Sequence, residues 1–171
     1  DKKARILAEA LTLFSTQGYV ATSLADIARA SDISKAGLLH HYSSKDQLLA
    51  AVLDERDRRT IVRLPRADAG AAAALDAWVE MVSHNQRHPD GVALYTAMSA
   101  AVIDATHQAH PWFRQHLMDA IAYLTSAFEH GKQTGEVREE APSEQIARRL
   151  VALSDGLQVQ WLCSRAQGGP T

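Results

Sequence analysis

The 171-residue chain has a single cysteine, Cys163, and few aromatic residues, which make up 6% of the sequence. One cysteine excludes an internal disulfide and a thiolate metal cluster, and it favours a reducing compartment. No apolar run approaches the roughly 18 residues that a membrane-spanning helix needs, and residues 1–5 lack the apolar core of a secretory signal. We therefore expect a cytoplasmic protein with no membrane partner.

Motifs for catalysis and for phosphate binding are also lacking. The sequence has no His-Glu-x-x-His pair, no glycine-rich phosphate loop and no nucleophile elbow. These absences predict a protein that is not an enzyme and uses no cofactor or metal. The alternative in the enzyme class is an all-helical metalloenzyme. Its candidate ligands would be His84, His88, His107 and His110.

The apolar residues that are present recur at helical spacing, and no alternating run is long enough for a strand. Serine caps and glycine or proline breaks divide the chain into helices. After a first helix that ends before Gly18, the expected helices are residues 24–30, 35–42, 45–63, 70–88, 92–105, about 111–131 and 143–164. The sequence therefore predicts an all-α fold.

Basic and acidic residues are unevenly distributed along the chain. Residues 1–63 contain ten Lys and Arg against eight Asp and Glu, whereas residues 64–171 contain eight against twelve. A positive N-terminal part fits a surface that faces nucleic acid, although a surplus of this size is common.

The expected helices 24–30 and 35–42, with a tight turn between them and a supporting helix on each side, form a helix-turn-helix pattern. Small side chains at the start of the second helix would let it approach base edges in a major groove. Serines and a lysine at helix starts are typical of phosphate contacts. The outward residues of the second helix are Lys35, Ala36, Gly37 and His40, and those at the other helix starts are Ser23, Ser44 and Lys45.

Residues Arg5 to Asp54 resemble the DNA-binding domain of TetR-family transcriptional regulators. The matching elements, in order, are Ala10, Leu13-Phe14, Gly18-Tyr19, Thr22-Ser23, Ile27-Ala28, Ile33-Ser34-Lys35, Leu38, His41-Tyr42, and Ser44-Lys45 with Leu48. Three positions depart from the family pattern. Asp32 stands where glycine is common, Gly37 where Thr or Ser often contacts DNA, and Leu39 where tyrosine is frequent. These departures concern the base readout and leave the docking mode unchanged.

The resemblance implies a homodimer that binds double-stranded DNA at a pseudo-palindromic operator. It divides the chain into a three-helix helix-turn-helix domain at residues 1–48, a linking helix at 45–63, and an all-helical ligand-binding and dimerisation domain at 49–171. The implied function is that of a repressor released by a small, largely apolar effector. For His41, packing is an equal alternative, and for Tyr42 a core position with the hydroxyl at the rim is favoured. The expected DNA-binding residues are Thr22, Ser23, Ser34, Lys35, Ala36, Gly37, His40, His41, Tyr42, Ser44 and Lys45.

Large apolar and amphipathic side chains are concentrated in the middle helices, which is typical of a pocket for an apolar ligand. The alternative is that most of them only fill the core. The polar members Asn85, Tyr95, Ser99 and His116 are the stronger candidates, because buried polar groups need partners. The expected ligand-binding residues are Trp78, Met81, Val82, Asn85, Tyr95, Met98, Ser99, Val102, Trp112, Phe113, His116, Leu117 and Tyr123.

The expected helix 143–164 is apolar on nearly all sides, and Asp155 is the only charge between Leu150 and Ser164. Such a helix must bury more than one face, and a second copy of the chain would cover the outer one. The alternative is a central core helix. The expected dimer interface is Leu150, Val151, Leu153, Ser154, Leu157, Gln158 and Trp161. A further alternative function is a helical interaction module that has lost DNA binding, which Gly37 and Leu39 would permit.

Overall fold

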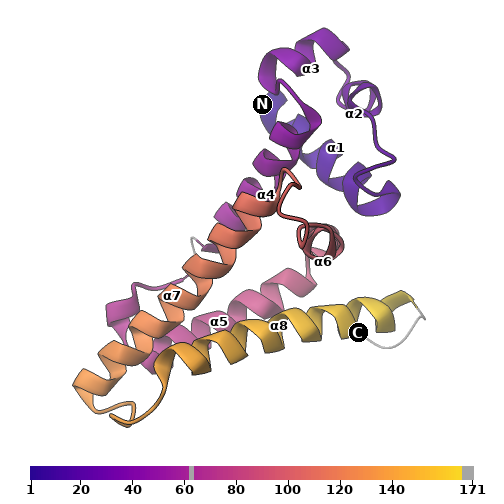
Figure 1. The fold of residues 1–171 in the computed structure, drawn as a ribbon. Coiled ribbons are helices and arrows are strands. Elements are labelled where there is room, and N and C mark those ends of the chain that lie inside the picture. The colour runs from indigo at the N-terminus through magenta and orange to yellow at the C-terminus, as the bar shows by residue number, and fades with distance from the viewer. Residues whose placement is uncertain (62–63, 167–171) are drawn as a thin grey trace. The chain divides into compact units, whose positions relative to one another are not determined.

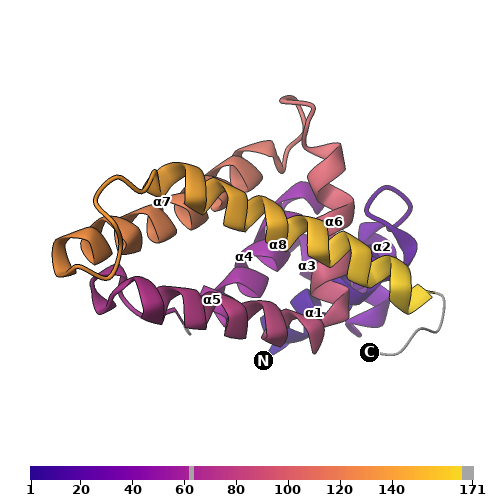
Figure 2. The ribbon, with the colours of Figure 1, turned by 90° about the horizontal axis from the view of Figure 1, so that it is seen from below.

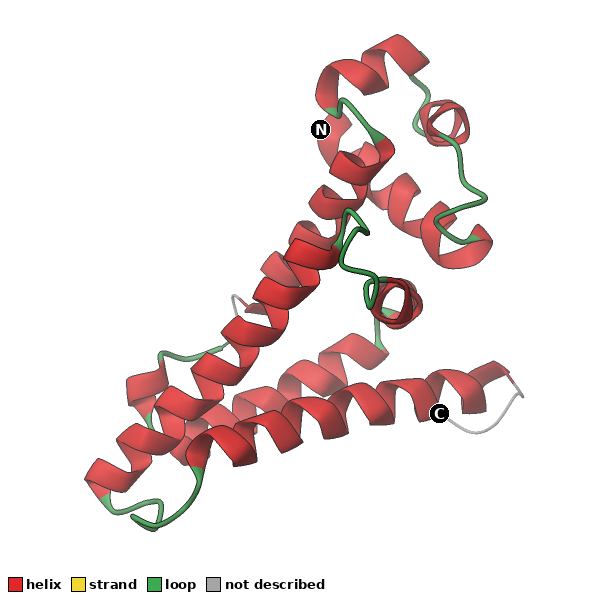
Figure 3. Ribbon diagram, in the orientation of Figure 1, coloured by secondary structure: helices red, strands yellow, loops and turns green. Residues whose placement is uncertain are grey.

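The computed structural model describes residues 1–61 and 64–166, and every regular element in these ranges is helical (Figure 3). The all-α prediction is confirmed. Arg63, the predicted end of the fourth helix, lies outside the described residues. None of the described helices is both long and apolar enough to cross a bilayer. The helices are α1 (Lys2–Gln17), α2 (Leu24–Ala30), α3 (Lys35–His41), α4 (Lys45–Ile61), the 3-10 turn η1 (Ala67–Ala69), α5 (Ala71–Gln86), α6 (Pro89–Ala101), α7 (His110–Thr134) and α8 (Ser143–Ala166).

The helices pack as two units. The first comprises Asp1–Arg59 and His88–Trp112, and the second comprises the remaining described residues. This division differs from the predicted boundary between residues 48 and 49, because α6 packs against α1 and thereby joins the helix-turn-helix. Helical periodicity indicates which face of α6 is buried, but it carries no information about which helix covers that face.

The core of the first unit comes from all five of its helices, which are labelled in Figure 1. α1 supplies one buried stripe at the spacing expected of an amphipathic helix, and the short helices α2 and α3 add the small core between them. The buried residues are Ile6, Ala10, Phe14, Ile27, Ala28, Leu38, Leu48, Leu49, Val52, Leu53, Val92, Leu94, Tyr95 and Met98.

Local hydrogen bonds place α3 relative to α2. Ser23, which the sequence places at a helix start, forms a capping box with Asp26 at the start of α2. Asp32 then adopts a left-handed conformation with φ 55°, which Asp tolerates better than most residues. The Oγ of Ser34 accepts a 3.0 Å hydrogen bond from the Gly37 N–H and starts α3. The sequence of the turn therefore determines where α3 begins.

The start of α6 differs from the prediction. The sequence favours a break at Pro89 and a new helix from Val92, whereas α6 begins at Pro89 itself. Proline is well suited to the first helical position, because its missing N–H would be unpaired there in any case. The helix also ends at Ala101, four residues earlier than expected.

The second unit is built on α5, α7 and α8. Figures 1 and 2 show α7 and α8 meeting at the connecting residues 135–142, and Figure 1 shows them diverging from that point. Gly131, near the end of α7, permits this packing, because a Cβ there would lie 2.7 Å from Val137 Cγ2 and 2.9 Å from Ala71 Cβ. The buried cluster that joins the three helices is Ala71, Trp78, Leu124, Phe128, Ala147 and Val151.

Candidate nucleic-acid interface and effector site

The outward side of α3 is open to solvent. Leu38 is fully buried, and Ala36 and His40, on the opposite side of the helix, are exposed. Lys35 and Leu39 are exposed as well, whereas Gly37 and His41 are half-buried. The structure therefore brings Lys35, Ala36 and His40 together on one accessible face.

Three of the predicted serines act as helix caps. The hydroxyl oxygens of Ser23, Ser34 and Ser44 accept hydrogen bonds of 3.0–3.2 Å from backbone N–H groups of α2, α3 and α4. These bonds satisfy N–H groups that a helix start leaves unpaired. Ser23 and Ser34 remain exposed. The hydroxyl hydrogen of Ser34 can still be donated to a phosphate, whereas that of Ser23 is donated to the Asp26 carboxylate at 2.5 Å.

Two of the predicted DNA contacts lie in the core instead. Thr22 is 1% exposed, and its hydroxyl donates to the carbonyl oxygen of Gly18 at 2.9 Å. Tyr42 is also buried, and burial raises the pKa of its phenol, with a smaller contribution from the charge of Glu55. These two side chains hold the turns in place, so direct contact with DNA is not supported for them. For Tyr42, the buried position is the one that the sequence favours.

Lys45 joins the start of α4 to the segment between α1 and α2. Its Nζ donates to the carbonyl oxygens of Tyr19 at 2.9 Å and Thr22 at 3.1 Å, and it lies 4.4 Å from the centroid of the Tyr19 ring. The Tyr19 hydroxyl in turn donates to the Asp46 carboxylate. Burial raises the pKa of Tyr19, and the Asp46 carboxylate raises it further. The ammonium of Lys45 is thus engaged inside the protein, a role that the sequence analysis missed.

α4 is also connected to α6 and to the start of α7. The Trp112 Nε1 donates a 2.7 Å hydrogen bond to Asp54. The guanidinium of Arg56 lies 4.5 Å from the centroid of the Tyr95 ring and pairs with Asp57 at 3.0 Å. Tyr95 and Trp112 were both predicted to bind a ligand, and in the structure they contact α4.

The other predicted ligand-binding residues are divided between the two units. In the first unit Met98 and Val102 are buried, whereas Ser99 is exposed and donates to the Thr96 carbonyl of its own helix. In the second unit Trp78 and Phe113 are buried. The partly buried members of the second unit are Met81, Val82, Asn85, His116, Leu117 and Tyr123. The residues therefore do not line one cavity within either unit.

Among the predicted ligand-binding residues, Tyr123 has a buried polar atom that lacks a hydrogen-bond partner within the described part of the chain. Its hydroxyl is buried without a hydrogen-bond partner among the described residues, and burial raises its pKa. The Oγ1 of Thr125 and the Oε1 of Gln158 are in the same situation. A buried oxygen without a partner costs free energy, so each such atom is a candidate contact for a bound molecule.

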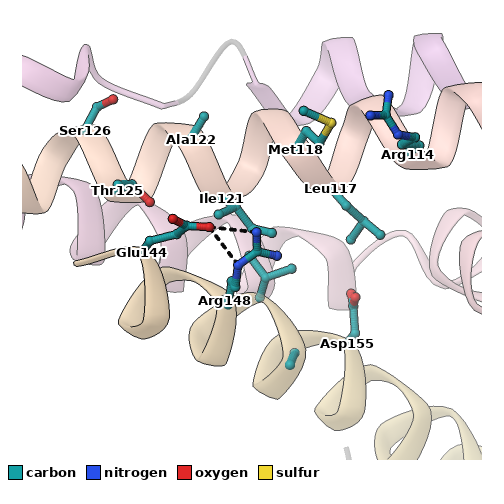
Figure 4. Close-up of a pocket in the computed structure, with 12 residues that line it drawn as sticks. Arg114, Leu117, Met118, Ile121, Ala122, Thr125, Ser126, Glu144, Arg148 and Asp155 are labelled. Carbon is teal, nitrogen blue, oxygen red and sulfur yellow. Dashed lines mark hydrogen bonds and ion pairs between the residues drawn. The ribbon is translucent and has the colours of Figure 1, made fainter. Parts of the chain in front are cut away.

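An open pocket of about 690 Å³ lies between α7 and α8. Figure 4 shows Leu117 and Ile121 extending from α7 toward α8, where Arg148 pairs with Glu144 at 2.7 Å. Of the predicted ligand-binding residues, only Leu117 belongs to its lining. The lining residues are Arg114, Leu117, Met118, Ile121, Ala122, Thr125, Ser126, Glu144, Arg148, Val151, Ala152 and Asp155.

α8 has one buried side and one exposed apolar side. Val151 belongs to the core, and Ser154 accepts a 2.9 Å hydrogen bond from the Trp78 indole. Leu153 and Leu157, by contrast, are 58% and 46% exposed. α8 is therefore not a central core helix. Among the predicted interface residues, Leu150 packs against the core cluster, and Gln158 and Trp161 are half-buried.

Within the described residues, no group of three or more His, Cys, Asp and Glu is arranged to hold a metal ion. Two histidines of the metalloenzyme alternative have other partners. His107 Nδ1 accepts the Ala109 N–H at 3.1 Å, and His110 Nδ1 lies 2.8 Å from the Val102 carbonyl oxygen. These contacts give the metalloenzyme alternative no support.

Residues 6–52 match the family model described as bacterial regulatory proteins of the tetR family. Over 46 residues the chain is 44% identical to the biofilm operon icaADBC HTH-type negative transcriptional regulator IcaR of Staphylococcus epidermidis, a segment that covers 27% of this chain and 25% of that relative. The chain thus spans about a quarter of the curated relative that it matches. Over these residues the match is to a family of bacterial regulatory proteins, as the sequence predicts.

Solved structures resemble the chain over nearly its whole length. A TetR transcription regulator from Haloarcula marismortui has a TM-score of 0.81 at 22% identity and covers 99% of this chain and 88% of its own. AibR in complex with isovaleryl coenzyme A and operator DNA has a TM-score of 0.68 at 20% identity, with coverages of 92% and 86%. These likenesses confirm the fold, a helix-turn-helix part followed by a helical part.

Proposed function

Because residues 6–52 match the TetR family model, we propose that this chain is a ligand-responsive transcriptional regulator of that family. In this proposal it is a cytoplasmic repressor that binds a pseudo-palindromic operator as a homodimer and is released by a small, largely apolar effector. The observation that carries the proposal is the exposed side of α3, with Lys35, Ala36 and His40 accessible within a segment that matches the family model.

For DNA binding, α3 enters the major groove and the capping serines lie beside the phosphates. Lys35 is exposed and can donate to a phosphate or a guanine. Ser34 stands at the start of α3, where its hydroxyl can still donate, whereas the Ser23 hydroxyl already donates to Asp26. Such phosphate contacts set affinity and register, and base edges supply the sequence preference.

For dimerisation, the exposed side of α8 packs against the same side of a second copy. Leu153 and Leu157 stand one turn apart and are both exposed. In a symmetric dimer the two α3 helices would bind half-sites about 34–36 Å apart. Leu153→Glu with Leu157→Glu should yield a monomer in analytical ultracentrifugation. A double variant that remains dimeric would place the interface elsewhere.

For effector binding, the second unit offers both apolar surface and unsatisfied oxygens. Trp78 and Leu117 provide apolar surface, and the Tyr123 hydroxyl and the Gln158 Oε1 are oxygens without a hydrogen-bond partner among the described residues. That AibR was solved with isovaleryl coenzyme A supports an effector that carries an apolar acyl group. Release requires the effector to prefer the state that does not bind DNA, and couplings of this kind are typically about 1–3 kcal/mol.

The test is binding of the full chain to labelled genomic fragments, measured by mobility shift over a range of salt concentrations. Lys35→Ala should weaken binding to every sequence and reduce the slope of log affinity against log salt by about 1. Arg138 is an exposed cation in the connection between α7 and α8. Arg138→Ala should leave the affinity and the salt slope unchanged. Absence of sequence-specific binding at low salt would refute the regulator and favour the interaction module.

A further inference from the structure

The outward side of α3 carries more hydrocarbon than hydrogen-bonding groups. Ala36 is exposed opposite the buried Leu38, and Leu39 is 39% exposed. Residues three apart are neighbours on a helix surface, with about 5–6 Å between their Cβ atoms. Ala36 and Leu39 therefore form one continuous apolar strip, which we call the Ala36–Leu39 strip.

The polar groups around this strip are few. The Ser34 oxygen accepts the Gly37 N–H at 3.0 Å, and Gly37 itself has no side chain. A Cβ at residue 37 would approach Ser34 Oγ to 3.3 Å, which is tight for a cap. Only Lys35 and His40 remain as exposed hydrogen-bonding side chains among residues 35–40. Hydrogen bonds alone would give this helix little capacity to distinguish one base pair from another.

We propose that the Ala36–Leu39 strip reads thymine C5-methyl groups in the major groove. The inference rests on the proposed DNA-binding function and names the base feature that α3 selects. Thymine presents a methyl group and one acceptor in the major groove, and apolar side chains contact that methyl. Burying it against the strip removes apolar surface of both partners from water. Lys35 and His40, at the edges of the strip, can donate to neighbouring base or phosphate acceptors.

Deoxyuridine tests the proposal, because it differs from thymidine only by the absent methyl. The full chain is used to select duplexes from a random library, and fluorescence anisotropy at one fixed salt concentration gives its affinity for the selected duplex. Each thymine is then replaced by deoxyuridine. At a thymine read by the strip we expect about fourfold weaker binding for one half-site and about fifteenfold for both, the effect of burying one and two methyl groups.

Two variants identify the side chain responsible. Leu39→Ala should bind the thymine duplex about as weakly as the unaltered chain binds the deoxyuridine duplex, and deoxyuridine should weaken it no further. Leu75→Ala is the matched control, because Leu75 lies on α5 with a similar exposure of 36%. The Leu75→Ala chain should show the same ratio of affinities for the thymine and deoxyuridine duplexes as the unaltered chain.

The outcomes separate this inference from the function on which it rests. Tolerance of deoxyuridine at every thymine of a selected duplex would overturn methyl reading and leave DNA binding intact. If a folded Leu39→Ala chain still bound the thymine duplex more tightly than the deoxyuridine duplex by the same ratio, methyl reading by the strip would also be overturned and DNA binding would remain intact. Failure to select any sequence would overturn the proposed function as well. The deoxyuridine comparison uses the unaltered chain, so it decides the question even if a variant does not fold.

Discussion

Trp112 and Asp54 connect the start of α7 to the second half of α4 through a 2.7 Å hydrogen bond from the indole Nε1 to the carboxylate. Nearby on α4, Arg56 lies against the Tyr95 ring of α6. A displacement of α6 or of the start of α7 must therefore strain or move α4, the helix that follows the helix-turn-helix. In the proposed regulator, these contacts give an effector a physical route to the DNA-binding helices.

The coupling between Trp112 and Asp54 can be measured with a double-mutant cycle. Trp112→Phe removes the N–H and keeps an aromatic ring, and Asp54→Ala removes the acceptor carboxylate. We expect a coupling free energy of about 0.5–1 kcal/mol in urea unfolding, because the bond is charge-assisted but exposed to solvent. Strictly additive effects would show that the bond contributes nothing to folding.

Lys45 should contribute to stability through its bonds to backbone carbonyls. Lys45→Met keeps an unbranched side chain but leaves the Tyr19 and Thr22 carbonyls without this donor. We expect the free energy of unfolding to fall by about 1–3 kcal/mol, as measured in urea. Lys35→Met, at an exposed position, is the control and should change it by less than about 0.5 kcal/mol. Equal stability of the two variants would contradict the role of Lys45.

Ser23 should control the acid sensitivity of the first unit. The hydroxyl of Ser23, then its backbone N–H and the Arg29 guanidinium, hold the pKa of Asp26 below its ordinary value. A carboxyl whose pKa is lower in the folded state stabilises above its ordinary pKa, near pH 4, and loses this contribution as the pH falls through the lowered value. Ser23→Ala should therefore raise the Asp26 pKa, measured by carboxyl NMR, and weaken the pH dependence of unfolding below about pH 4.

The matched control for Ser23 is Ser34, which caps α3 without an acidic residue in the first turn. Each serine-to-alanine change should cost about 1 kcal/mol at pH 7 through loss of the cap. Only Ser23→Ala should alter the acid limb of the stability curve. The same pH profile in both variants would show that Asp26 does not depend on Ser23.

Asp32 should be replaceable by glycine with a gain in stability. Its φ of 55° is unfavourable for a residue with a Cβ by roughly 1 kcal/mol and free of this cost for glycine. The ion pair with Arg5, at 3.8 Å between exposed side chains, contributes little. We expect Asp32→Gly to raise the melting temperature and Asp32→Ala to lower it. The reverse order would contradict the left-handed turn.

Gly131 and Gly91 should respond to alanine in opposite directions. Alanine at 131 would clash with Val137 and Ala71 at distances below 3.0 Å, whereas alanine at 91 would meet Arg56 at an ordinary 3.6 Å. We expect Gly131→Ala to cost about 1–3 kcal/mol and Gly91→Ala to add roughly 0.5–1 kcal/mol, because alanine favours a helix. Urea unfolding of both variants tests the packing of α7 on α5.

The sequence predicted what local chemistry determines. The serine at the start of α2 and the outward side of α3 follow from a few neighbouring residues and from helical periodicity, and Asp32 was singled out as standing where glycine is common. Periodicity could not show that Tyr95 and Trp112 turn toward α4, because it identifies a buried face without its partner. The carbonyl contacts of Lys45 were missed for the same reason. The backbone oxygens that it contacts belong to residues more than twenty positions away, and the residue pattern around Lys45 does not indicate them.

The assignment of α6 to the first unit limits where the chain can be truncated to give a folded fragment. The chain passes from the first unit to the second after Arg59, returns at His88 and leaves again after Trp112. A fragment that stops at residue 59 would lack Val92, Leu94 and Met98, and α1 would lose the helix that packs against it. The helix-turn-helix segment is therefore not an independent folding unit. Attached alone to another protein, it should be prone to aggregation and proteolysis unless α6 is included.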